Sequence, residues 1–227
     1  MKELAYGASH EINNPLANIS ARAQTLLRDE RDPERRRALE SIQQQALRAH
    51  EMISDLMLFA RPPQLELAPV DAGVLVRQIA AEMQAECQRR DIAMSATADA
   101  DLPVLRADAV QLAVAVRALA ANAVEAIGRG GNVEITANSL PGALPDADGD
   151  SPWLRVEVRD DGPGIAAEIR PHVFDPFFSG REAGRGLGFG LSKAWRIVHE
   201  HGGRLTAENA ERGAIFRIEL PAEAVAR

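Results

Sequence analysis

The feature that most constrains the fold is a run of apolar residues spaced alternately three and four apart. Its members are Leu39, Ile42, Ala46, Ala49, Ile53, Leu56 and Ala60. This spacing is the a/d repeat of a coiled coil, so it predicts one long helix with an apolar seam. An earlier segment carries a matching stripe, at Ile12, Leu16, Ile19, Ala23 and Leu26. Asp32-Pro33 interrupts the pattern, and proline suits the first turn of a new helix, so we expect a helical hairpin.

A two-helix hairpin of this kind cannot bury its apolar seam alone. A second hairpin would complete a four-helix bundle, so packing favours a homodimer formed through a domain at residues 1–61. Arg61-Pro62-Pro63 ends the second helix. Because proline also favours extended backbone in the residue before it, residues 62–70 are predicted to be an extended linker.

The remaining residues, 71–227, alternate between helical and extended patterns. Helices are predicted at 71–90, 109–127 and 190–201, and strands at 102–105, 132–137, 153–159, 204–208 and 215–220. The segment 140–152 is rich in Pro, Gly and Asp and is predicted to be a surface loop. Helices grouped on one face of a single mixed sheet make an α/β sandwich, which is the fold class that we expect for this domain.

The composition argues against some classes of function. The chain has 227 residues and a formal net charge of −7, which argues against the basic surface that nucleic-acid binding needs. Its one cysteine, Cys87, cannot form an internal disulfide, so a cytoplasmic location is expected. No apolar run approaches the roughly 18 to 20 residues of a membrane span, and no signal peptide precedes Lys2-Glu3. Because the first motif follows almost at once, we expect a fragment without membrane contact, whose natural upstream region held any sensory or membrane segment.

The first motif with chemical potential is Ser9-His10-Glu11-Ile12-Asn13-Asn14-Pro15-Leu16. His10 lies two residues before Ile12, roughly 200° around the helix, so it is predicted to point away from the seam. Glu11 places a carboxylate beside the imidazole, and Asn14 stands one turn further on the same face. Pro15 removes an amide from the helical ladder at a cost of about 3 kcal/mol, which loosens the helix beside His10. A helical histidine is usually a solvated surface side chain, but these neighbours favour a nucleophile.

Two glycine-containing segments downstream suit a nucleotide. Asp160-Asp161-Gly162-Pro163-Gly164 follows a predicted strand; its glycines permit close backbone approach, and Asp160 could accept a hydrogen bond from the exocyclic amine of adenine. Taken alone, this segment fits an ordinary strand-to-helix turn better than a nucleotide site. The run Gly184 to Leu191 opens a helix, so its amides can face phosphate oxygens. It is neither a P-loop nor a dinucleotide fingerprint.

One polar residue interrupts the predicted apolar helix at 109–127. Asn122 stands in Ala120-Ala121-Asn122-Ala123-Val124. A buried amide without a partner is costly, and a magnesium ion that bridges phosphates would give it one. By itself the segment slightly favours an asparagine on the surface of a helix.

Together these motifs resemble, in order and spacing, the catalytic core of the sensor histidine kinases. Residues 9–16 resemble the H box of their dimerisation and phosphoacceptor domain. The segment around Asn122 is similar to their N box, residues 160–165 to their first glycine box, and residues 184–191 to their second.

Further segments extend this resemblance to nearly the whole chain. Phe174-Asp175-Pro176-Phe177-Phe178 is similar to the F box, and residues 197–203 to the helix end that follows the second glycine box. Residues 56–62 resemble the branch that contains the nitrogen-regulatory sensor kinases. The resemblance implies that residues 71–227 have the Bergerat ATP-binding fold shared with gyrase, Hsp90 and MutL.

The resemblance also implies roles for the residues that match the motifs. His10 would be the phosphoacceptor, and Glu11 the base that orients it or takes its proton. Asn14 matches the position that orients water when such kinases dephosphorylate their response regulator. Asn122 would hold Mg²⁺, and Asp160 would read the adenine of ATP. The other ATP-binding residues implied are Gly162, Gly164, Arg181, Gly184, Arg185, Gly186, Leu187 and Gly188.

Several positions depart from the family's usual pattern. Ala118 stands where a first asparagine of the N box is common. Ser179-Gly180-Arg181 replaces the usual two threonines and lysine, although Arg181 keeps the charge. Arg185 replaces a small hydroxyl residue and either contacts phosphate or is solvated, and Phe189 replaces a leucine. These changes affect the geometry of the lid over ATP more than the presence of activity.

Four functions are compatible with these residues. The leading one is an ATP- and Mg²⁺-dependent autokinase that passes its phosphoryl group to the aspartate of a response regulator receiver domain. The second is a regulator dominated by phosphatase activity, in which Asn14 matters most. The third is a non-catalytic dimeric scaffold that binds nucleotide, and the fourth is a gyrase- or Hsp90-like ATPase. The short turn at 28–33 leaves open whether His10 is phosphorylated within a protomer or between protomers.

Overall fold

The computed structural model describes most of the chain. The described residues are 2–60, 64–140, 152–176, 178 and 189–223, and in the first range side chains are described for 12–50 and 53. The chain divides into two compact units, Met1–Gln64 and Leu65–Arg227, which are taken in turn below.

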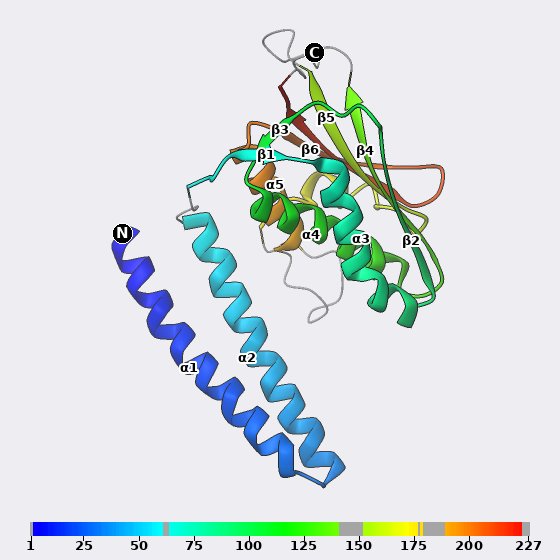
Figure 1. The fold of residues 1–227 in the computed structure, drawn as a ribbon. Helices are drawn as coiled ribbons and strands as arrows, with labels where there is room; N and C mark the ends of the chain where they lie inside the picture. Colours follow the sequence, from blue (N-terminus) through cyan, green and yellow to red (C-terminus); the bar gives the residue numbers. More distant parts are fainter. Residues whose placement is uncertain (1, 61–63, 141–151, 177, 179–188, 224–227) are drawn as a thin grey trace. The chain divides into compact units, whose positions relative to one another are not determined.

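The first unit is a hairpin of two long helices, α1 (Lys2–Asp29) and α2 (Pro33–Ala60) (Figure 1). Asp32 separates them, and its Oδ1 accepts hydrogen bonds from the backbone N–H of Glu34 at 2.8 Å and of Arg35 at 3.2 Å. These bonds satisfy two of the donors left over at the start of α2. The predicted helical hairpin is therefore confirmed, with Pro15 inside α1 as the sequence indicated.

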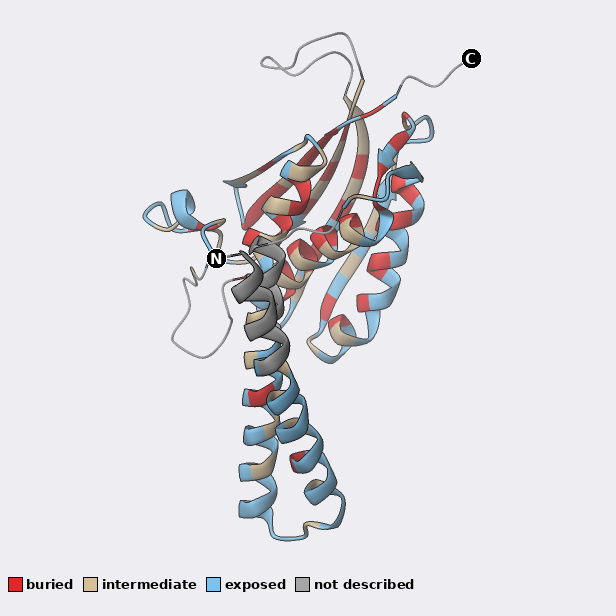
Figure 2. Cartoon of the chain, turned by 90° about the vertical axis from the view of Figure 1, so that its left-hand side faces the viewer, coloured by how far each residue is buried: buried red, intermediate tan, exposed pale blue. Residues whose placement is uncertain are grey.

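The apolar seam of the hairpin is only partly covered within one chain. Ala23 and Ala46, near its middle, are buried. The larger seam side chains are about half exposed, with Ile12 at 47%, Ile19 at 45%, Leu26 at 59% and Ile42 at 48%. One hairpin thus leaves these apolar side chains about half exposed, and exposed residues predominate in its described part (Figure 2).

The second unit is an α/β sandwich. Its helices are α3 (Ala72–Arg89), α4 (Ala109–Ile127), η1 (Arg170–His172) and α5 (Gly190–Glu200). Its strands are β1 (Ala68–Val70), β2 (Ile92–Ala98), β3 (Leu105–Ala107), β4 (Gly131–Leu140), β5 (Trp153–Asp160), β6 (Arg204–Asn209) and β7 (Ala214–Pro221). Asp71 caps α3 as expected, because its Oδ1 accepts from the N–H of Val74 at 2.8 Å.

Five strands form one mixed sheet in the order β2-β4-β5-β7-β6, in which β2 and β4 are parallel and the other neighbours antiparallel. The helices α3, α4 and α5 cover one face of this sheet (Figure 1). The core lies between these two layers. Alternate residues of three strands are fully buried against the helices, at Val133, Ile135, Ala137, Leu154, Val156, Val158, Phe216, Ile218 and Leu220. The predicted fold class, a mixed sheet with helices on one face, is confirmed.

Three details differ from the sequence prediction. β2 was not predicted, because its alternating positions are mostly Ala, Ser and Thr, which give a weak apolar period. The strand predicted at 102–105 lies later, at β3. β1 falls within the predicted linker, where it pairs with β3 in a separate two-stranded sheet, so these residues belong to the α/β unit.

The sequence expectation that no run could span a membrane also needs correction. Among the described residues, α4 is long and apolar enough by length and composition to do so. Its mean hydropathy is high because it is rich in alanine and other apolar residues, as suits a helix packed in a core. The residues Leu112, Ala115, Val116, Leu119 and Ala120 are fully buried there.

Candidate active site

The candidate site is organised around α4, which contacts both β5 and α5. The helix begins at Asp108, whose Oδ1 accepts from the N–H of Val110 and of Gln111, each at 3.1 Å. Further along, Ala123 and Val124 are buried, whereas the preceding Asn122 is only half-buried. The amide of Asn122 therefore stands at the margin of the buried face, where an oxygen ligand for a cation is accessible.

The end of β5 places the second polar residue of the site. Asp160 is its last residue and is only 3% exposed. Within the described part of the chain, both hydrogen bonds to this carboxylate end on Oδ1, from the N–H of Gly162 at 2.9 Å and of Ala214 at 3.3 Å. The Oδ2 atom is left to a ligand. Such an oxygen can accept a hydrogen bond from an exocyclic amine such as that of adenine.

Burial dominates the electrostatics of Asp160. It raises the pKa of this carboxyl above the usual value, and the charge of Asp161 adds to the effect, while the hydrogen bonds from Gly162 and Ala214 oppose it. The neighbour behaves differently: hydrogen bonds from the backbone and side chain of Asn132 lower the pKa of Asp161. Two adjacent carboxyls thus have distinct tasks, with Asp161 fixing the loop and Asp160 facing the site.

The loop after Asp160 is held by residues far away in the sequence. Asn209, at the end of β6, accepts from the N–H of Ile165 at 2.7 Å and donates to the carbonyl of Ile165 at 2.9 Å. Asn132 donates to both carboxylate oxygens of Asp161, each at 2.8 Å. Gly164 has a φ of +77°, and a Cβ there would lie 3.0 Å from Asn209 Oδ1. The loop is therefore rigid before any ligand binds, which reduces the entropy lost on binding.

Gly213 makes the closest backbone approach in the site. Its φ is +80°, and a Cβ at this position would lie 1.9 Å from the carbonyl oxygen of Asp160. Only glycine fits there. Gly213, Asn209 and Asn132 are not among the site residues predicted from the sequence. A lone glycine just before a predicted strand is a signal of close backbone approach that would have identified the first, whereas no local pattern marks the two asparagines.

The start of α5 lies against α4. A Cβ on Gly190 would be 4.0 Å from the Cβ of Ala118, which is one helical turn before Asn122. Phe189 is buried, and its carbonyl accepts from the hydroxyl of Ser192 at 3.1 Å. The chain therefore leaves the second glycine-rich segment close to Asn122. The predicted ATP-binding residues Arg181, Gly184, Arg185, Gly186, Leu187 and Gly188 lie outside the described residues.

The predicted nucleophile belongs to the hairpin. His10 and Glu11 lie on α1, eighteen or more residues before its end at Asp29, and their side chains lie outside the described part of the chain. Asn14 is exposed to solvent, one turn after His10. His10 therefore belongs to the first unit, whereas Asn122 and Asp160 belong to the second.

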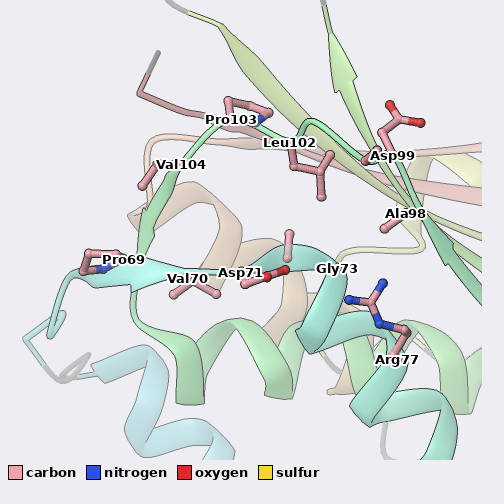
Figure 3. Close-up of a pocket in the computed structure, with 12 residues that line it drawn as sticks. Pro69, Val70, Asp71, Gly73, Arg77, Ala98, Asp99, Leu102, Pro103 and Val104 are labelled. Atoms are coloured by element: carbon pink, nitrogen blue, oxygen red, sulfur yellow. The ribbon is translucent and has the colours of Figure 1, made fainter. Parts of the chain in front are cut away.

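A separate cavity of about 580 Å³ lies at the start of α3 (Figure 3). Asp71, Arg77 and Asp99 contribute its charged groups, and Leu102 and Val104 are among its apolar ones. None of the predicted nucleotide-binding residues lines it.

The arrangement around Asp160 fits an adenine nucleotide with Mg²⁺. Asp160 presents a carboxylate oxygen, and Gly213 leaves no room for a side chain beside it. The amide oxygen of Asn122 is the kind of hard ligand that Mg²⁺ prefers. Within the described ranges, no three His, Cys, Asp or Glu side chains are grouped to hold a metal ion. Phosphate and water oxygens would therefore complete the coordination of Mg²⁺.

Comparison with known families gives two matches. Residues 107–224 match the family described as histidine kinase-, DNA gyrase B-, and HSP90-like ATPase. Residues 1–64 match the His Kinase A (phospho-acceptor) domain.

Individual relatives cover nearly the whole chain. The sensor histidine kinase ZraS of Escherichia coli K12 is 32% identical over 222 residues, which are 96% of this chain and 45% of ZraS. The sensory histidine kinase/phosphatase NtrB of Rhodobacter capsulatus is 34% identical over 218 residues, which are 94% of this chain and 60% of NtrB. The chain spans about half the length of the curated relatives it matches.

Two solved structures of histidine kinases are similar to this chain. Full-length ShkA in complex with AMPPNP superposes with a TM-score of 0.80 at 27% identity and covers 100% of this chain and 47% of that one. Histidine kinase ThkA in complex with the response regulator protein TrrA gives a TM-score of 0.68 at 25% identity and covers 99% and 63%.

Proposed function

Because the chain belongs to the family of histidine kinase-, DNA gyrase B- and HSP90-like ATPases, with a His Kinase A domain before it, we propose that it is the catalytic core of a sensor histidine kinase. The core transfers the γ-phosphoryl group of ATP to His10, and from there to the aspartate of a response regulator receiver domain. One observation carries this proposal: a match to the His Kinase A (phospho-acceptor) domain is followed on the same chain by an α/β unit in which Asp160 is buried at the end of β5.

The α/β unit, which we propose to be the ATP-binding domain at 71–227, holds the donor. Asp160 accepts a hydrogen bond from the exocyclic amine of adenine through Oδ2. Asn122 holds Mg²⁺ at the phosphate end. Gly162, Gly164 and the segment that contains Arg181, Gly184, Arg185, Gly186, Leu187 and Gly188 enclose the nucleotide. The bound nucleotide supplies the phosphoryl group, and the metal neutralises part of its charge.

His10 attacks as a neutral imidazole. A ring nitrogen forms a bond to the γ-phosphorus, the bond to the bridging oxygen of the β-phosphate breaks, and ADP leaves. Histidine has an ordinary pKa near 6.5, so most of it is neutral at pH 7 and needs little activation. Glu11 orients the ring and takes its proton. The remaining requirement is positioning: the attacking ring nitrogen and the γ-phosphorus must come within roughly 3–3.5 Å of each other.

The hairpin at 1–61 serves as dimerisation and phosphotransfer domain. The linker at 62–70, whose last three residues form β1 of the α/β unit, joins it to the ATP-binding domain. The exposed seam residues Ile12, Ile19, Leu26 and Ile42 give a second copy of the chain an apolar surface to bury, which supports a homodimer. The complex of ThkA with TrrA supports a receiver domain as the partner. We place this core in the cytoplasm, as part of a longer sensor, without nucleic-acid or membrane contact of its own.

A second activity at the same site is dephosphorylation of the regulator. The R. capsulatus relative carries both kinase and phosphatase in its name. Asn14 is exposed one turn from His10, where its amide can orient a water toward a phosphoaspartate. The likeness to NtrB also supports the nitrogen-regulatory branch.

Incubation with γ-labelled ATP tests the main proposal. The parent chain should become labelled, the label should be lost in acid and kept in alkali, and His10→Ala should take up none. A gyrase-like ATPase would instead release labelled phosphate, and a scaffold would bind ATP without either product. Label retained in His10→Ala, or a product stable to acid, contradicts the proposal.

A further inference from the structure

Outside the nucleotide site, a set of polar contacts joins the beginning of the α/β unit to the ends of two of its helices. We call this set the linker clamp and define it as Glu66, Asp108, Gln111 and His201. Its centre, Asp108, is only 8% exposed. Glu66 precedes β1 and is the third described residue after the gap that follows α2.

The two oxygens of Asp108 have different partners. Oδ1 accepts from the N–H of Val110 and of Gln111, and so caps α4. Oδ2 accepts from the backbone N–H of Glu66 at 3.2 Å and from Nε2 of Gln111 at 3.2 Å. Burial works against the charge of Asp108, yet these hydrogen bonds bring its pKa below the usual value. A helix cap needs only Oδ1, so the bond to Glu66 calls for another reason.

His201 ties the end of α5 to the same point. The backbone N–H of Asp108 donates to Nε2 of His201 at 2.9 Å, and Nδ1 of His201 contacts the carbonyl of Ile197 at 2.8 Å. Because a carbonyl only accepts, Nδ1 carries the proton and Nε2 is the acceptor. The ring is thereby fixed in one neutral tautomer between the start of α4 and the end of α5.

The clamp also contains an unsatisfied group. Oε1 of Gln111 is buried and has no hydrogen-bond partner among the described residues, whereas Nε2 of the same side chain donates to Asp108. Such a group lowers stability and is found where a site serves something other than stability.

The helices that meet at the clamp border the nucleotide site at their other ends. α4 carries Asn122, and α5 begins at Gly190, beside Ala118 and directly after the second glycine-rich segment. A displacement of Glu66 is therefore passed through hydrogen bonds to both helices.

We propose that Asp108 and His201 are positioning residues for phosphotransfer, which hold the linker at Glu66 to the two helices that border the nucleotide. The linker then moves the nucleotide site as one rigid body toward the hairpin, and its free length ends at residue 65. This inference rests on the proposed kinase function, and it adds two residues that do not touch ATP or His10.

Two substitutions remove the Glu66–Asp108 bond from opposite sides. Asp108→Asn keeps Oδ1 for the cap but replaces Oδ2 by a nitrogen that cannot accept. Glu66→Pro deletes the donating N–H and leaves Asp108 unchanged. Glu66→Ala is the matched control, because it removes the side chain and keeps the N–H.

The first measurement does not depend on activity. Amide hydrogen exchange in the parent chain should show Glu66 protected, and Asp108→Asn should lose this protection while Val110 and Gln111 stay protected. A Glu66 amide that exchanges freely in the parent overturns the clamp. If the parent takes up no label from ATP, the kinase proposal fails, and this measurement still decides whether the clamp exists.

The second measurement separates positioning from ATP binding. At saturating ATP, Glu66→Pro should slow autophosphorylation about three- to tenfold, as expected for one lost hydrogen bond. Asp108→Asn also loses the bond from Nε2 of Gln111, but should slow the reaction to the same extent, because only the bond to Glu66 reaches the linker. The KM for ATP should stay within about twofold, and the double variant should be no slower than either single one. Glu66→Ala should keep the parent rate. Unchanged rates in both variants, multiplying effects in the double variant, or a matching rise in KM contradicts the positioning role.

A third variant pair examines His201. His201→Leu leaves the N–H of Asp108 without an acceptor and should slow autophosphorylation to a similar extent. His201→Gln offers a carbonyl oxygen in reach of the same N–H and should restore at least half of the parent rate. If the leucine and glutamine variants are equally slow, the ring serves packing only and His201 is not a positioning residue.

Discussion

The two units of this chain bury their apolar side chains to very different degrees. In the α/β unit, Val76, Leu119, Ile135 and Leu154 are fully buried. In the hairpin, the hydrophobic side chains that are buried among those described are Ala23 and Ala46 alone. Figure 2 shows the contrast, with exposed residues along most of the hairpin and buried ones throughout the α/β unit. The α/β unit thus contains a complete hydrophobic core, whereas the hairpin contributes only one half of a core along its seam.

This difference separates the tasks of the two units. A unit with a complete hydrophobic core can fold and bind nucleotide as a monomer. In the proposed homodimer, a hairpin with an open seam depends on a second copy, so its stability would depend on protein concentration. Signals that alter the pairing of hairpins can then act on His10 while the ATP-binding site stays intact.

The largest expected effect comes from truncating one core residue in each unit. Leu119→Ala should lower the free energy of unfolding of the α/β unit by about 3 kcal/mol at any protein concentration, because Leu119 is 0% exposed. Ile42→Ala should lower that of the hairpin by about 1–2 kcal/mol, because Ile42 belongs to the seam that we propose a second hairpin covers.

Leu47 offers a matched control for the hairpin. Leu47 and Ile42 are nearly equally exposed in one chain, at 47% and 48%, but Leu47 lies off the seam. Leu47→Ala should change the stability by less than about 0.5 kcal/mol. Denaturant titrations at two protein concentrations measure the free energy of unfolding of all three variants, Leu119→Ala, Ile42→Ala and Leu47→Ala. Equal effects of Ile42→Ala and Leu47→Ala would mean that the seam stays wet.

Asp160→Asn tests the α/β unit by separating its ATP affinity from its stability. ATP affinity should fall about 10- to 100-fold, because a charge-assisted hydrogen bond is lost. The stability of the unit at neutral pH should not fall. A pKa raised by folding means that the ionised carboxylate disfavours the folded state above that pKa, so removing the charge stabilises. Calorimetry with a non-hydrolysable analogue and a melting curve test both parts; unchanged affinity would place adenine recognition elsewhere.

A smaller effect is expected from pH. Burial raises the pKa of Asp160, so on acidification it is protonated before an ordinary aspartate, whose pKa is about 3.9. ATP affinity should therefore begin to fall at a higher pH than that value and be constant well above it. The Asp160→Asn variant titrated in parallel corrects for protonation of ATP itself. Parallel curves for parent and variant would exclude Asp160 as the titrating group.

The smallest effect on autophosphorylation is expected from Asn14→Ala, in the hairpin. Asn14 is exposed, and the chemistry at His10 does not need its amide, so the labelling rate should stay within about twofold. Dephosphorylation of the partner regulator should fall at least about tenfold. The rate of label release from a phosphorylated regulator, compared between the parent chain and Asn14→Ala, measures this dephosphorylation. A large loss of autophosphorylation would instead make Asn14 part of the kinase reaction.

The parts of the structure that the sequence predicted well are those with local signals. The three- and four-residue spacing and Pro33 marked both hairpin helices, and Asp71 marked the start of α3. Asp160 was recognisable because it follows an alternating strand and precedes two glycines. Each of these signals lies within a few residues of the element that it defines.

The parts that were missed depend on distant contacts. Asn209 holds the loop at Ile165 from 44 residues away, and Gly213 is required by the backbone of Asp160, 53 positions earlier in the chain. β2 has weak intrinsic strand character, and its parallel pairing with β4 stabilises it. No local pattern encodes such pairings.

The hydrogen bond between Glu66 and Asp108 also sets the length of the linker that is free to extend between α2 and the α/β unit. From Ala60, the last residue of α2, to Glu66 the chain can extend at most roughly 20 Å. Counted from the turn between α1 and α2, His10 is level with residue 52, roughly 12 Å along the hairpin from Ala60. The fully extended linker is thus longer than this offset. A deletion of two or three residues within 61–65 shortens its reach by roughly 7–10 Å, so autophosphorylation should fall while nucleotide binding is kept.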